Sequence, residues 1–397
     1  MAAVEPQPSR VTSGKPPIRF DRNEFAGAFG DIGTDLPLIV GMILVAGLDA
    51  ASVLILFGAM QVLTALWYRM PIPVQPLKAV AALVIAQKLS ADVVYGAGLA
   101  IGLVMLVLTV TGGLDLLARL IPKLVIRGIQ FGLGLQLSTL ALREFVPAEG
   151  VAGFWLAGAG FVLAIMFLGN RKYPAALFVI GLGVLYALVA KAPVAGALDG
   201  LGLRLPEVRT IGWAEVWTGF VLLALPQIPL SLGNSVLATK QLVADYFPER
   251  PISLRKIGFT YSVMNLINPF FGGVPTCHGS GGLAGHYAFG ARTGGSVVIY
   301  GAMYLVLGLF LSGGFASVIQ VFPKPILGVI LAFEGLALMV LVRDQAAPDV
   351  PRYALPIALM VGLMAVGLPY GYVIGMAVGA VLAASARRFE MGGVFSR

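Results

Sequence analysis

The sequence predicts an all-α polytopic membrane protein of about 14 transmembrane segments, arranged as two inverted halves of seven. Three observations support this prediction. Apolar stretches of about 20 residues, the length that crosses a bilayer as a helix, recur along the 397 residues. Lysine and arginine gather in alternate loops. Each half also carries one short segment that opens with proline, and paired interrupted segments of this kind are typical of transporter binding sites.

The composition excludes an ordinary soluble protein. The chain is 58% hydrophobic and 12% charged, with a mean hydropathy of +0.91, whereas soluble domains are about 25% charged. The single cysteine, Cys277, excludes an internal disulfide framework. The net charge of +8 is typical of basic cytoplasmic loops and does not indicate nucleic-acid binding. No cofactor is expected.

Hydropathy divides the chain into two repeats. We expect a disordered cytoplasmic tail at 1–22, a first repeat at 23–191, a linker at 192–212, a second repeat at 213–386 and a cytoplasmic tail at 387–397. The predicted spans are 23–46, 51–69, a short one at 74–89, 92–112, 123–143, 151–169, 173–191, 213–242, 253–271, a short one at 277–289, 294–314, 322–342, 353–367 and 369–386. The polar start does not resemble a signal peptide.

The distribution of charge predicts the orientation of the spans. With a cytoplasmic N-terminus, most of the 27 lysines and arginines fall in cytoplasmic loops. This asymmetry favours an orientation in which both termini are inside. Because each half has an odd number of spans, the second half is inverted relative to the first. We expect the protein to lie in the cytoplasmic membrane.

The first short segment reads "MPIPVQPLKAVAAL" and covers Met70 to Leu83. Prolines hold its first part extended, and Pro76 fits the first position of a helix, where its missing N–H costs nothing. We therefore expect a half-helix that starts inside the membrane with free amides around Leu77 and Lys78. Such an end attracts anions. Lys78 adds a full charge and Gln75 adds two donors.

The second short segment lies in "GGVPTCHGSGGLAGHYAF". Its half-helix is expected to begin near His278, Gly279 and Ser280, where the glycines let the backbone approach a ligand closely. Two positive helix ends that face each other at mid-membrane would form a socket for a small oxyanion. The predicted substrate-binding residues are Gln75, Leu77, Lys78, Gln227, Asn234, His278, Gly279 and Ser280.

Two further segments, each opening one repeat, are polar at membrane depth. The first, "GAFGDIGTDLPLIVG", carries Asp31, Thr34 and Asp35. Separately, "LAFEGLAL" in a later span carries the lone acid Glu334. Ionisable residues within spans are functional candidates. We expect Asp31, or else Glu334, to couple transport to protons, because a proton that arrives with a dianion offsets part of its charge.

The second such segment, "ALPQIPLSLGNSVLATKQL", opens the second repeat. Its Gln227 and Asn234 are two helical turns apart and therefore share about one face. Pro226 and Pro229 should loosen the helix around Gln227. Repeat symmetry places both amide side chains beside the half-helices.

Each candidate also has a structural interpretation that stays open. The alternatives are a helix-joining ion pair for Lys78, interhelical hydrogen bonding for Gln75, buried packing for His278, apolar filling for Cys277 and a neutral structural acid for Glu334. An ion pair of Lys78 with Asp31 or Asp35 is compatible with a role in the site.

At these residues the sequence resembles a known family. The blocks "GAFGDIGTDLPL", "PIPVQPLKAVAA", "VIRGIQFGLGLQL", "PQIPLSLGNSVLA" and "VPTCHGSGGLAGHYAFGARTG" are similar to molybdate transporters of the sulfate-permease superfamily, from about residue 24 to 342. "PVQPLK" and "PTCHGSGGLAGHYAFGARTG" are the most specific. The family's motif positions fall on Asp31, Gln75, Lys78, Gln227, Asn234, His278, Gly279 and Ser280. Many sulfate permeases end in a soluble STAS domain, and we expect none in this chain.

The resemblance implies a core domain that holds the site, a gate domain, and uptake of molybdate, a tetrahedral dianion. Tungstate or sulfate as substrate, another anion or a nucleobase in the same fold, and an anion channel are the competing interpretations. An enzyme is not expected, because the two histidines, His278 and His286, belong to no metal or nucleophile cluster. The expected partners are the anion, lipid and protons, and a homodimer is left open.

Overall fold

The computed structural model describes residues 17–114, 116, 122–167, 175–190, 201–315 and 322–391. These residues are mostly helical. The first half contains α1 (Arg22–Gly27), α2 (Ile32–Ala46), α3 (Ala50–Tyr68), β1 (Gln75–Pro76), α4 (Lys78–Gln87), α5 (Ala91–Thr111), α7 (Lys123–Leu140), the π-helical η1 (Ala141–Phe145), η2 (Val146–Glu149), α8 (Gly150–Met166) and α9 (Ala175–Ala190).

The second half begins with one long, irregular helix. It consists of α10 (Trp213–Gly219), η3 (Phe220–Ala224), α11 (Leu225–Leu230), η4 (Ser231–Leu237) and α12 (Ala238–Tyr246). The remaining elements are α13 (Leu254–Ile267), η5 (Asn268–Phe271), β2 (Thr276–Cys277), α14 (Ser280–Ala288), α15 (Gly295–Phe310), α17 (Lys324–Val340), η6 (Leu341–Ala346), α18 (Ala354–Gly367) and α19 (Gly371–Met391).

Helices occupy every segment for which the hydropathy predicts a span. Among the described residues, five helical segments are long and apolar enough to cross a membrane by length and composition alone, so the number of 14 spans stays a prediction. Two expected ends differ in detail. Helix α1 begins at Arg22, within the predicted tail, and α19 continues to Met391, past the predicted end at 386. Residues 1–16 and 392–397 of the expected tails, and 191–200 near the expected linker, lie outside the described residues.

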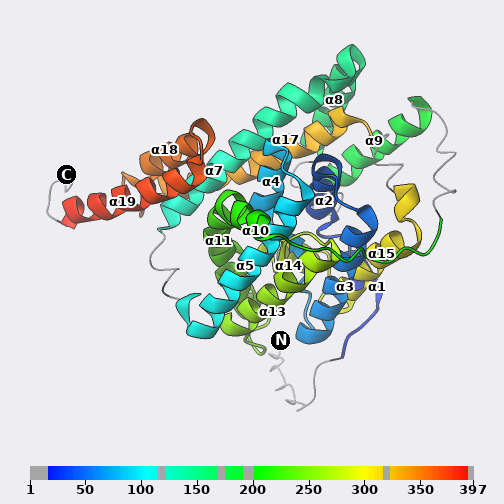
Figure 1. Ribbon diagram of the computed structural model, residues 1–397, viewed down its shortest axis with the longest axis horizontal. Coiled ribbons are helices and arrows are strands. Elements are labelled where there is room, and N and C mark those ends of the chain that lie inside the picture. Colours follow the sequence, from blue (N-terminus) through cyan, green and yellow to red (C-terminus); the bar gives the residue numbers. More distant parts are fainter. Residues whose placement is uncertain are drawn as a thin grey trace, which may run out of the picture.

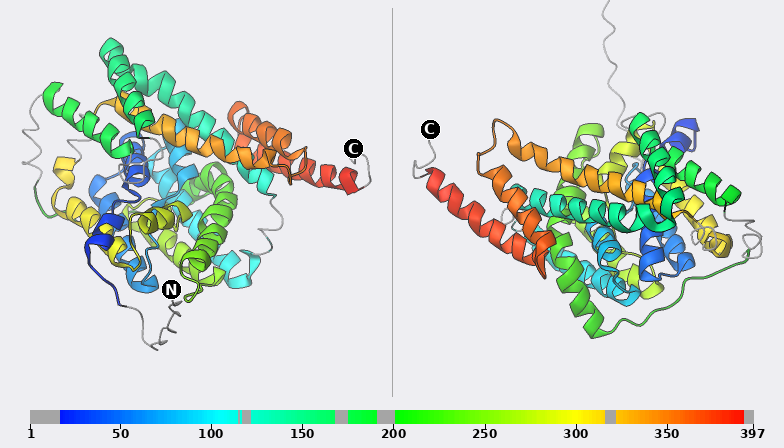
Figure 2. Two further views of the ribbon diagram at one scale, coloured as in Figure 1. Left: turned by 180° about the vertical axis from the view of Figure 1, so that it is seen from behind. Right: turned by 90° about the horizontal axis from the view of Figure 1, so that it is seen from above.

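The helices form two groups. Helices α7 and α8 pack against α17, and α7 also packs against α18 and α19. Figures 1 and 2 show these five helices as an arm along one side of the remaining helices. In the other group α3 packs on α15, and α5 packs on α10 and α13. We call the first group, with α9, the gate layer and the second group the core layer.

The order of the two layers repeats along the chain. In each half the core helices come first and the gate helices follow: α2 to α5 and then α7 to α9, and α10 to α15 and then α17 to α19. This order fits the predicted inverted repeat. The layers touch where α4 packs on α7 and where α2 packs on α17 and α9. An apolar cavity of about 110 Å³ lies at the second contact, lined by Leu36, Val40, Ile180, Phe322 and Ile330 among others.

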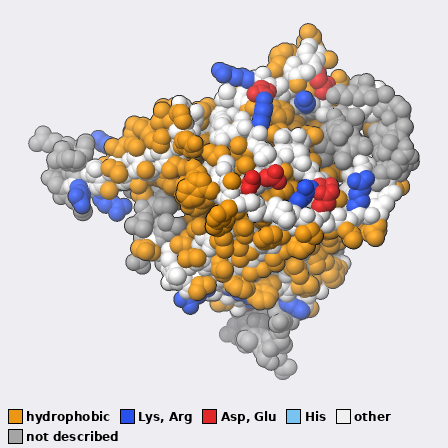
Figure 3. Space-filling model, viewed as in Figure 1, with side chains coloured by type: hydrophobic (Ala, Val, Ile, Leu, Met, Phe, Trp, Pro, Cys, Tyr) orange, Lys and Arg blue, Asp and Glu red, His pale blue; other side chains and the backbone are white. Residues whose placement is uncertain are grey.

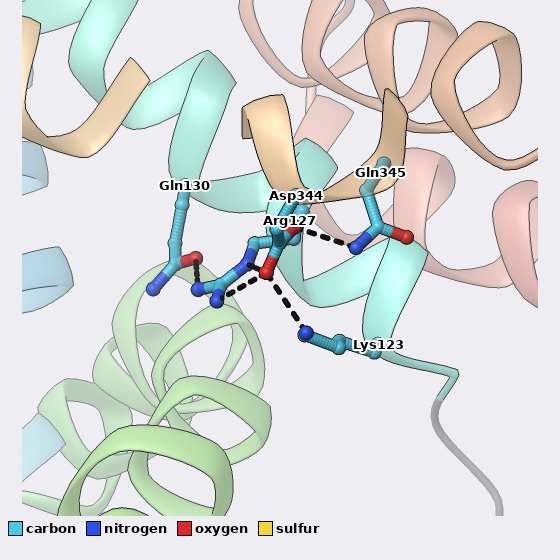
Figure 4. Close-up of polar contacts among 5 residues, drawn as sticks. All are labelled: Lys123, Arg127, Gln130, Asp344 and Gln345. Carbon is cyan, nitrogen blue, oxygen red and sulfur yellow. Dashed lines mark hydrogen bonds and ion pairs between the residues drawn. The ribbon is translucent and has the colours of Figure 1, made fainter. Parts of the chain in front are cut away.

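A charged cluster joins two gate elements (Figure 4). Asp344 of η6 accepts hydrogen bonds from Nε and Nη2 of Arg127 on α7, at 2.9 and 2.7 Å. Lys123 lies 2.8 Å from the same carboxylate oxygen, and Gln345 donates to the other at 2.6 Å. Arg127 also donates to Gln130 at 2.9 Å. The cluster therefore fixes the end of α17 against the first turns of α7.

The surface is apolar to an extent that only a membrane protein sustains. Figure 3 shows a wide hydrophobic band across this face, with acidic and basic side chains above it and basic side chains below it. Large side chains such as Trp67, Val110, Trp155, Trp213 and Trp217 are more than half exposed. Lipid tails are the solvent that such a surface matches.

Candidate functional site

Two short strands hold the two half-helix starts together. β1 and β2 pair antiparallel, with Gln75 opposite Cys277 and Pro76 opposite Thr276. Helix α4 begins two residues after β1, at Lys78, and α14 begins three residues after β2, at Ser280. The structure thus brings the two predicted helix starts side by side, within the buried interior of the core layer.

The first half-helix starts later than the sequence suggests. Pro76 was expected at the first helical position, but it lies in β1 and the first helical residue is Lys78. The reason is the strand pairing, which extends by one hydrogen bond from the amide of Leu77 to the carbonyl of Pro275, at 3.0 Å. The expectation that the Leu77 amide faces a ligand therefore does not hold in this structure.

Two buried amide side chains support the strands, and sequence reasoning missed both. Gln61 of α3 accepts from the amide of Val74 at 2.8 Å and donates to its carbonyl at 2.6 Å. Asn265 of α13 makes the same pair of bonds with Thr276, at 2.9 and 2.7 Å. Val74 and Thr276 each lie four residues before a half-helix start. A buried amide in an otherwise apolar helix was the available signal.

Gln75 and Asp31 lie next to the start of α14. The amide nitrogen of Gln75 donates to both carboxylate oxygens of Asp31, at 2.8 and 2.7 Å. A Cβ atom on Gly279 would overlap Oε1 of Gln75, and one on Gly282 would overlap Oδ2 of Asp31. Only glycine fits at these two positions, because the polar side chains occupy the space that a Cβ would need.

The remaining charged residues of the core lie around this pair. Asp35 is fully buried, accepts from the hydroxyl of Tyr300 at 3.1 Å, and is in electrostatic range of Asp31 and Lys78. Lys78 is the partly buried first residue of α4. Thr34 is partly buried in the first turn of α2, where its amide donates to the carbonyl of Asp31 at 3.0 Å. Two acids and one lysine therefore lie close together in the core layer.

The irregular helix carries its two amide side chains to the two half-helices, one to each. Oε1 of Gln227 accepts from the backbone amides of Ala79 and Val80, at 3.0 and 3.2 Å. Oδ1 of Asn234 accepts from the hydroxyl of Ser280 at 2.9 Å. The prediction that Gln227 and Asn234 lie beside the half-helices is confirmed.

The local sequence explains this irregularity. Pro226 and Pro229 remove two amide donors, and π-helical turns flank α11 on both sides, at Phe220–Ala224 and Ser231–Leu237. π-turns of this kind occur frequently at functional sites. The helix can therefore yield where it meets the two half-helices.

Two predicted residues, His278 and Glu334, do not lie beside the Gln75–Asp31 pair. The ring of His278 is fully buried, hydrogen-bonded through Nε2 to Thr260 at 2.7 Å, with its centroid 5.3 Å from that of Tyr68. This geometry matches the packing interpretation of His278. Glu334 lies in α17 of the gate layer, and its side chain is outside the described part of the chain.

The start of α14 is the open part of the site. Gly281 is exposed, and nothing lies within 4 Å of the position that its Cβ would take. The amides of the first helical turn have no acceptor within the helix. Farther along α14, Ala284, Gly285 and Ala288 line a cavity of about 560 Å³ with Arg292, whose guanidinium stacks 3.6 Å from the ring centroid of Tyr287. The open space at Gly281 therefore lies beside the amide donors of the helix start.

The donor set suits an oxyanion better than a metal. Backbone amides at helix starts and a lysine ammonium donate hydrogen bonds and carry positive charge. Within the described residues, no group of three or more histidine, cysteine, aspartate or glutamate side chains is arranged to hold a metal ion.

Comparisons with known proteins place the chain among molybdate transporters. A family model described as "Molybdate transporter of MFS superfamily" matches residues 23–137 and 219–338. Molybdate transporter 1 of Arabidopsis thaliana is 33% identical over 366 aligned positions, which cover 81% of this chain and 80% of that protein. Molybdate transporter 2 of the same plant is 32% identical, covering 82% and 80%. Molybdate transporter 1 of Chlamydomonas reinhardtii is 26% identical, covering 92% and 93%.

Solved structures of low sequence identity share the fold. The transmembrane domain of the cyanobacterial bicarbonate transporter BicA superposes with a TM-score of 0.64 at 16% identity, covering 92% of this chain and 98% of that one. SLC26A9 superposes with a TM-score of 0.68 at 12% identity, covering 93% and 65%. The family and the fold are those of an integral membrane transporter rather than an enzyme. The matched segments contain both half-helices, and the chain belongs to the molybdate transporter family.

Proposed function

We propose that this protein is a secondary active transporter that imports molybdate across the cytoplasmic membrane. The observation that carries the proposal is the pairing of β1 with β2, because it sets the positive ends of α4 and α14 next to each other within the core layer. The names of the relatives supply the substrate. A tetrahedral dianion can collect several charge-assisted hydrogen bonds from such donors, each worth about 1.5–3 kcal/mol.

In this proposal the anion binds against the first turn of α14. The amides of Ser280 and Gly281 donate to it, and Lys78 supplies the main positive charge. Gly279 gives the close approach, and Gln75 and Asn234 fix the borders of the site. His278 supports the site by packing in the buried core, and Leu77 supports it through the hydrogen bond from its amide to the carbonyl of Pro275.

Transport is proposed to occur by alternating access. The core layer carries the site and slides against the gate layer, so that the anion faces each side of the membrane in turn. The apolar lining of the cavity between α2, α9 and α17 supports this movement, because apolar side chains slide past one another there without breaking directional bonds. Seven spans in each repeat and two cytoplasmic termini complete the proposed topology.

We further propose that protons are the coupling ion. Asp31 and Asp35 are both at least 96% buried and lie within electrostatic range of each other, so a dianion entering beside them meets negative charge. Protonation of one carboxyl would relieve that repulsion. Asp31 is the first candidate because it contacts Gln75 at the site, and Glu334 of the gate layer is the second.

The test is equilibrium binding of molybdate, tungstate and sulfate to the purified protein, measured in parallel, followed by uptake of the bound anion into proteoliposomes. The proposal expects molybdate to bind most tightly, with tungstate close to it. Saturable uptake and trans-stimulation of molybdate exchange by internal molybdate would identify a carrier. Sulfate binding without molybdate binding, or uptake that never saturates, would reject the proposal.

A further inference from the structure

Two backbone amides at the start of α4 already donate to a side chain of the protein. Helix α4 offers the amides of Ala79 and Val80 at the second and third positions of its first turn, and both donate to Oε1 of Gln227, at 3.0 and 3.2 Å. These are the positions at which an N-cap side chain normally accepts. The N-cap residue of α4 is Leu77, whose side chain cannot accept, so a residue far away in the sequence takes the place of a cap.

The side chain of Gln227 turns its oxygen toward the half-helix and its nitrogen toward Ser231. Its side-chain nitrogen donates to the hydroxyl of Ser231 at 3.0 Å, and that hydroxyl is 2.7 Å from the hydroxyl of Tyr261. Gln227 is only 4% exposed, and Ser231 and Tyr261 are fully buried. An anion needs donors, whereas Gln227 here directs its acceptor oxygen at α4 and covers two donors that the anion would use.

The two half-helix ends therefore differ. At α14 the corresponding side chain, Asn234, accepts from the hydroxyl of Ser280 and not from the backbone. Gly281 beside it is exposed, with open space at its Cβ position. One end of the site is open and the other is occupied by a neutral amide oxygen, which is a weaker acceptor than an oxyanion.

We propose that Gln227 is an internal competitor of the transported oxyanion: it occupies the amides of Ala79 and Val80 when the site is empty and must leave them for the anion to bind both half-helices. This inference deepens the proposed function and rests on it. The prolines at 226 and 229 and the flanking π-turns allow the movement, because the two prolines have no amide to donate to the preceding turn and the π-turns interrupt the α-helical pattern. Gln227 thus lowers the affinity, and it keeps the end of α4 capped between transport events.

This role makes the opposite prediction from direct ligation. If Gln227 donated to the anion, its removal would weaken binding. As a competitor, its removal strengthens binding, because the anion no longer has to displace it. A carboxylate at the same place would hold the positive helix end more tightly than the amide does.

The experiment is titration of the purified full-length protein with molybdate, tungstate and sulfate, for the wild type and the variants Gln227→Ala and Gln227→Glu. The Kd of Gln227→Ala is expected to fall roughly 5- to 30-fold, the equivalent of one or two net hydrogen bonds. The Kd of Gln227→Glu is expected to rise by a factor on the order of 100. Thermal unfolding of the ligand-free Gln227→Ala protein should begin at lower temperature, because α4 has lost its cap.

Ser231→Ala serves as a second variant, in case Gln227→Ala does not fold. It releases the side-chain nitrogen of Gln227 without removing the residue, so its Kd is expected to fall by a smaller factor. Ser262→Ala is the matched control, because this buried hydroxyl donates to the carbonyl of Gly258 on its own helix, at 2.7 Å. Its Kd should equal that of the wild type.

The outcomes separate the inference from the proposed function. A higher or unchanged Kd in folded Gln227→Ala overturns the competitor role, whichever anion the wild type binds. A wild type that binds sulfate but not molybdate rejects the proposed substrate, and the competitor role is then judged on sulfate. Binding that appears only in Gln227→Ala supports the competitor role, and no binding of the three anions to any variant overturns both.

Discussion

Gln75 donates its single amide nitrogen to both carboxylate oxygens of Asp31, at 2.8 and 2.7 Å. This contact joins the strand before one half-helix to the start of α2, and its neighbours on the other side are the glycines of α14. Three elements of the core layer therefore meet at one buried carboxylate. A change of charge at Asp31 therefore alters the electrostatic potential at the place where we expect the anion.

Replacement of Asp31 by asparagine should uncouple uptake from the proton gradient. The amide keeps the size of the carboxyl but cannot accept a proton, so an inward pH gradient should no longer stimulate molybdate uptake into proteoliposomes at fixed membrane potential. Asp92→Asn, at an exposed position at the start of α5, is the control and should keep the stimulation. Full stimulation in Asp31→Asn would leave Glu334 as the remaining candidate.

Lys78→Ala should weaken molybdate binding about 10- to 100-fold, which corresponds to one charge-assisted hydrogen bond of about 1.5–3 kcal/mol. The cause is loss of the ammonium at the start of α4. Lys88→Ala is a matched control at the other end of the same helix, where the side chain is 63% exposed and pairs with Glu144. Calorimetric titration of both variants checks the prediction, and equal affinities for the two would argue against a role for Lys78.

Gly279→Val should abolish binding and lower the stability of the core layer. The new side chain would overlap Oε1 of Gln75 and push it from Asp31. Gly158→Val on α8 is the comparison, because that glycine is exposed and has nothing within 4 Å of its Cβ position. Thermal unfolding and anion titration of the two variants should differ clearly; a Gly279→Val protein that binds normally would show that the site lies elsewhere.

Gln61→Leu and Asn265→Leu should have similar effects, since the two amides support equivalent residues. Each variant leaves one buried backbone amide and one carbonyl without partners, at a cost of about 1–3 kcal/mol per group. We expect a lower unfolding midpoint and weaker anion binding in both. Gln241→Leu, at an exposed position on α12, is the control. A large effect of one variant and none of the other would contradict the equivalence.

Asp344→Ala should destabilise the gate layer without changing the affinity for the anion. The variant removes an acceptor shared by Arg127, Lys123 and Gln345, and a loss of about 1–3 kcal/mol in the free energy of unfolding is expected for such a partly exposed cluster. Asp349→Ala, an exposed residue nearby, is the control. Urea or heat unfolding measures the difference, and a changed Kd in Asp344→Ala would show that the cluster communicates with the site.

Most helix boundaries could be predicted from the sequence, because apolar runs bounded by polar loops dominate a membrane chain. The predicted start of α4, at Pro76, was two residues too early. A proline favours the first turn of a helix locally, but the pairing of Pro76 with Thr276 depends on residues 200 positions away. Local rules do not contain that contact.

The sequence predicted which residues lie at the candidate site, but not which atoms of their side chains face which partners. Gln227 was expected among the substrate-binding residues, yet its side-chain oxygen accepts from the backbone amides of α4. An amide side chain has both a donor and an acceptor end, and only its neighbours decide which end points where. Gln61 and Asn265 escaped notice for a related reason: their partners are backbone atoms, which carry no signature in the sequence.

The equivalent supports of Gln61 and Asn265 have a consequence for the energetics of the transport cycle. Both hold backbone that precedes a half-helix, and both lie on helices of the same layer, so the two half-helix starts form one stiff unit beside the movable side chain of Gln227. In the proposed alternating-access cycle, this unit would offer the anion the same backbone contacts on either side of the membrane and would store no elastic energy. The direction of net flux in that cycle would be set by ion gradients and membrane voltage.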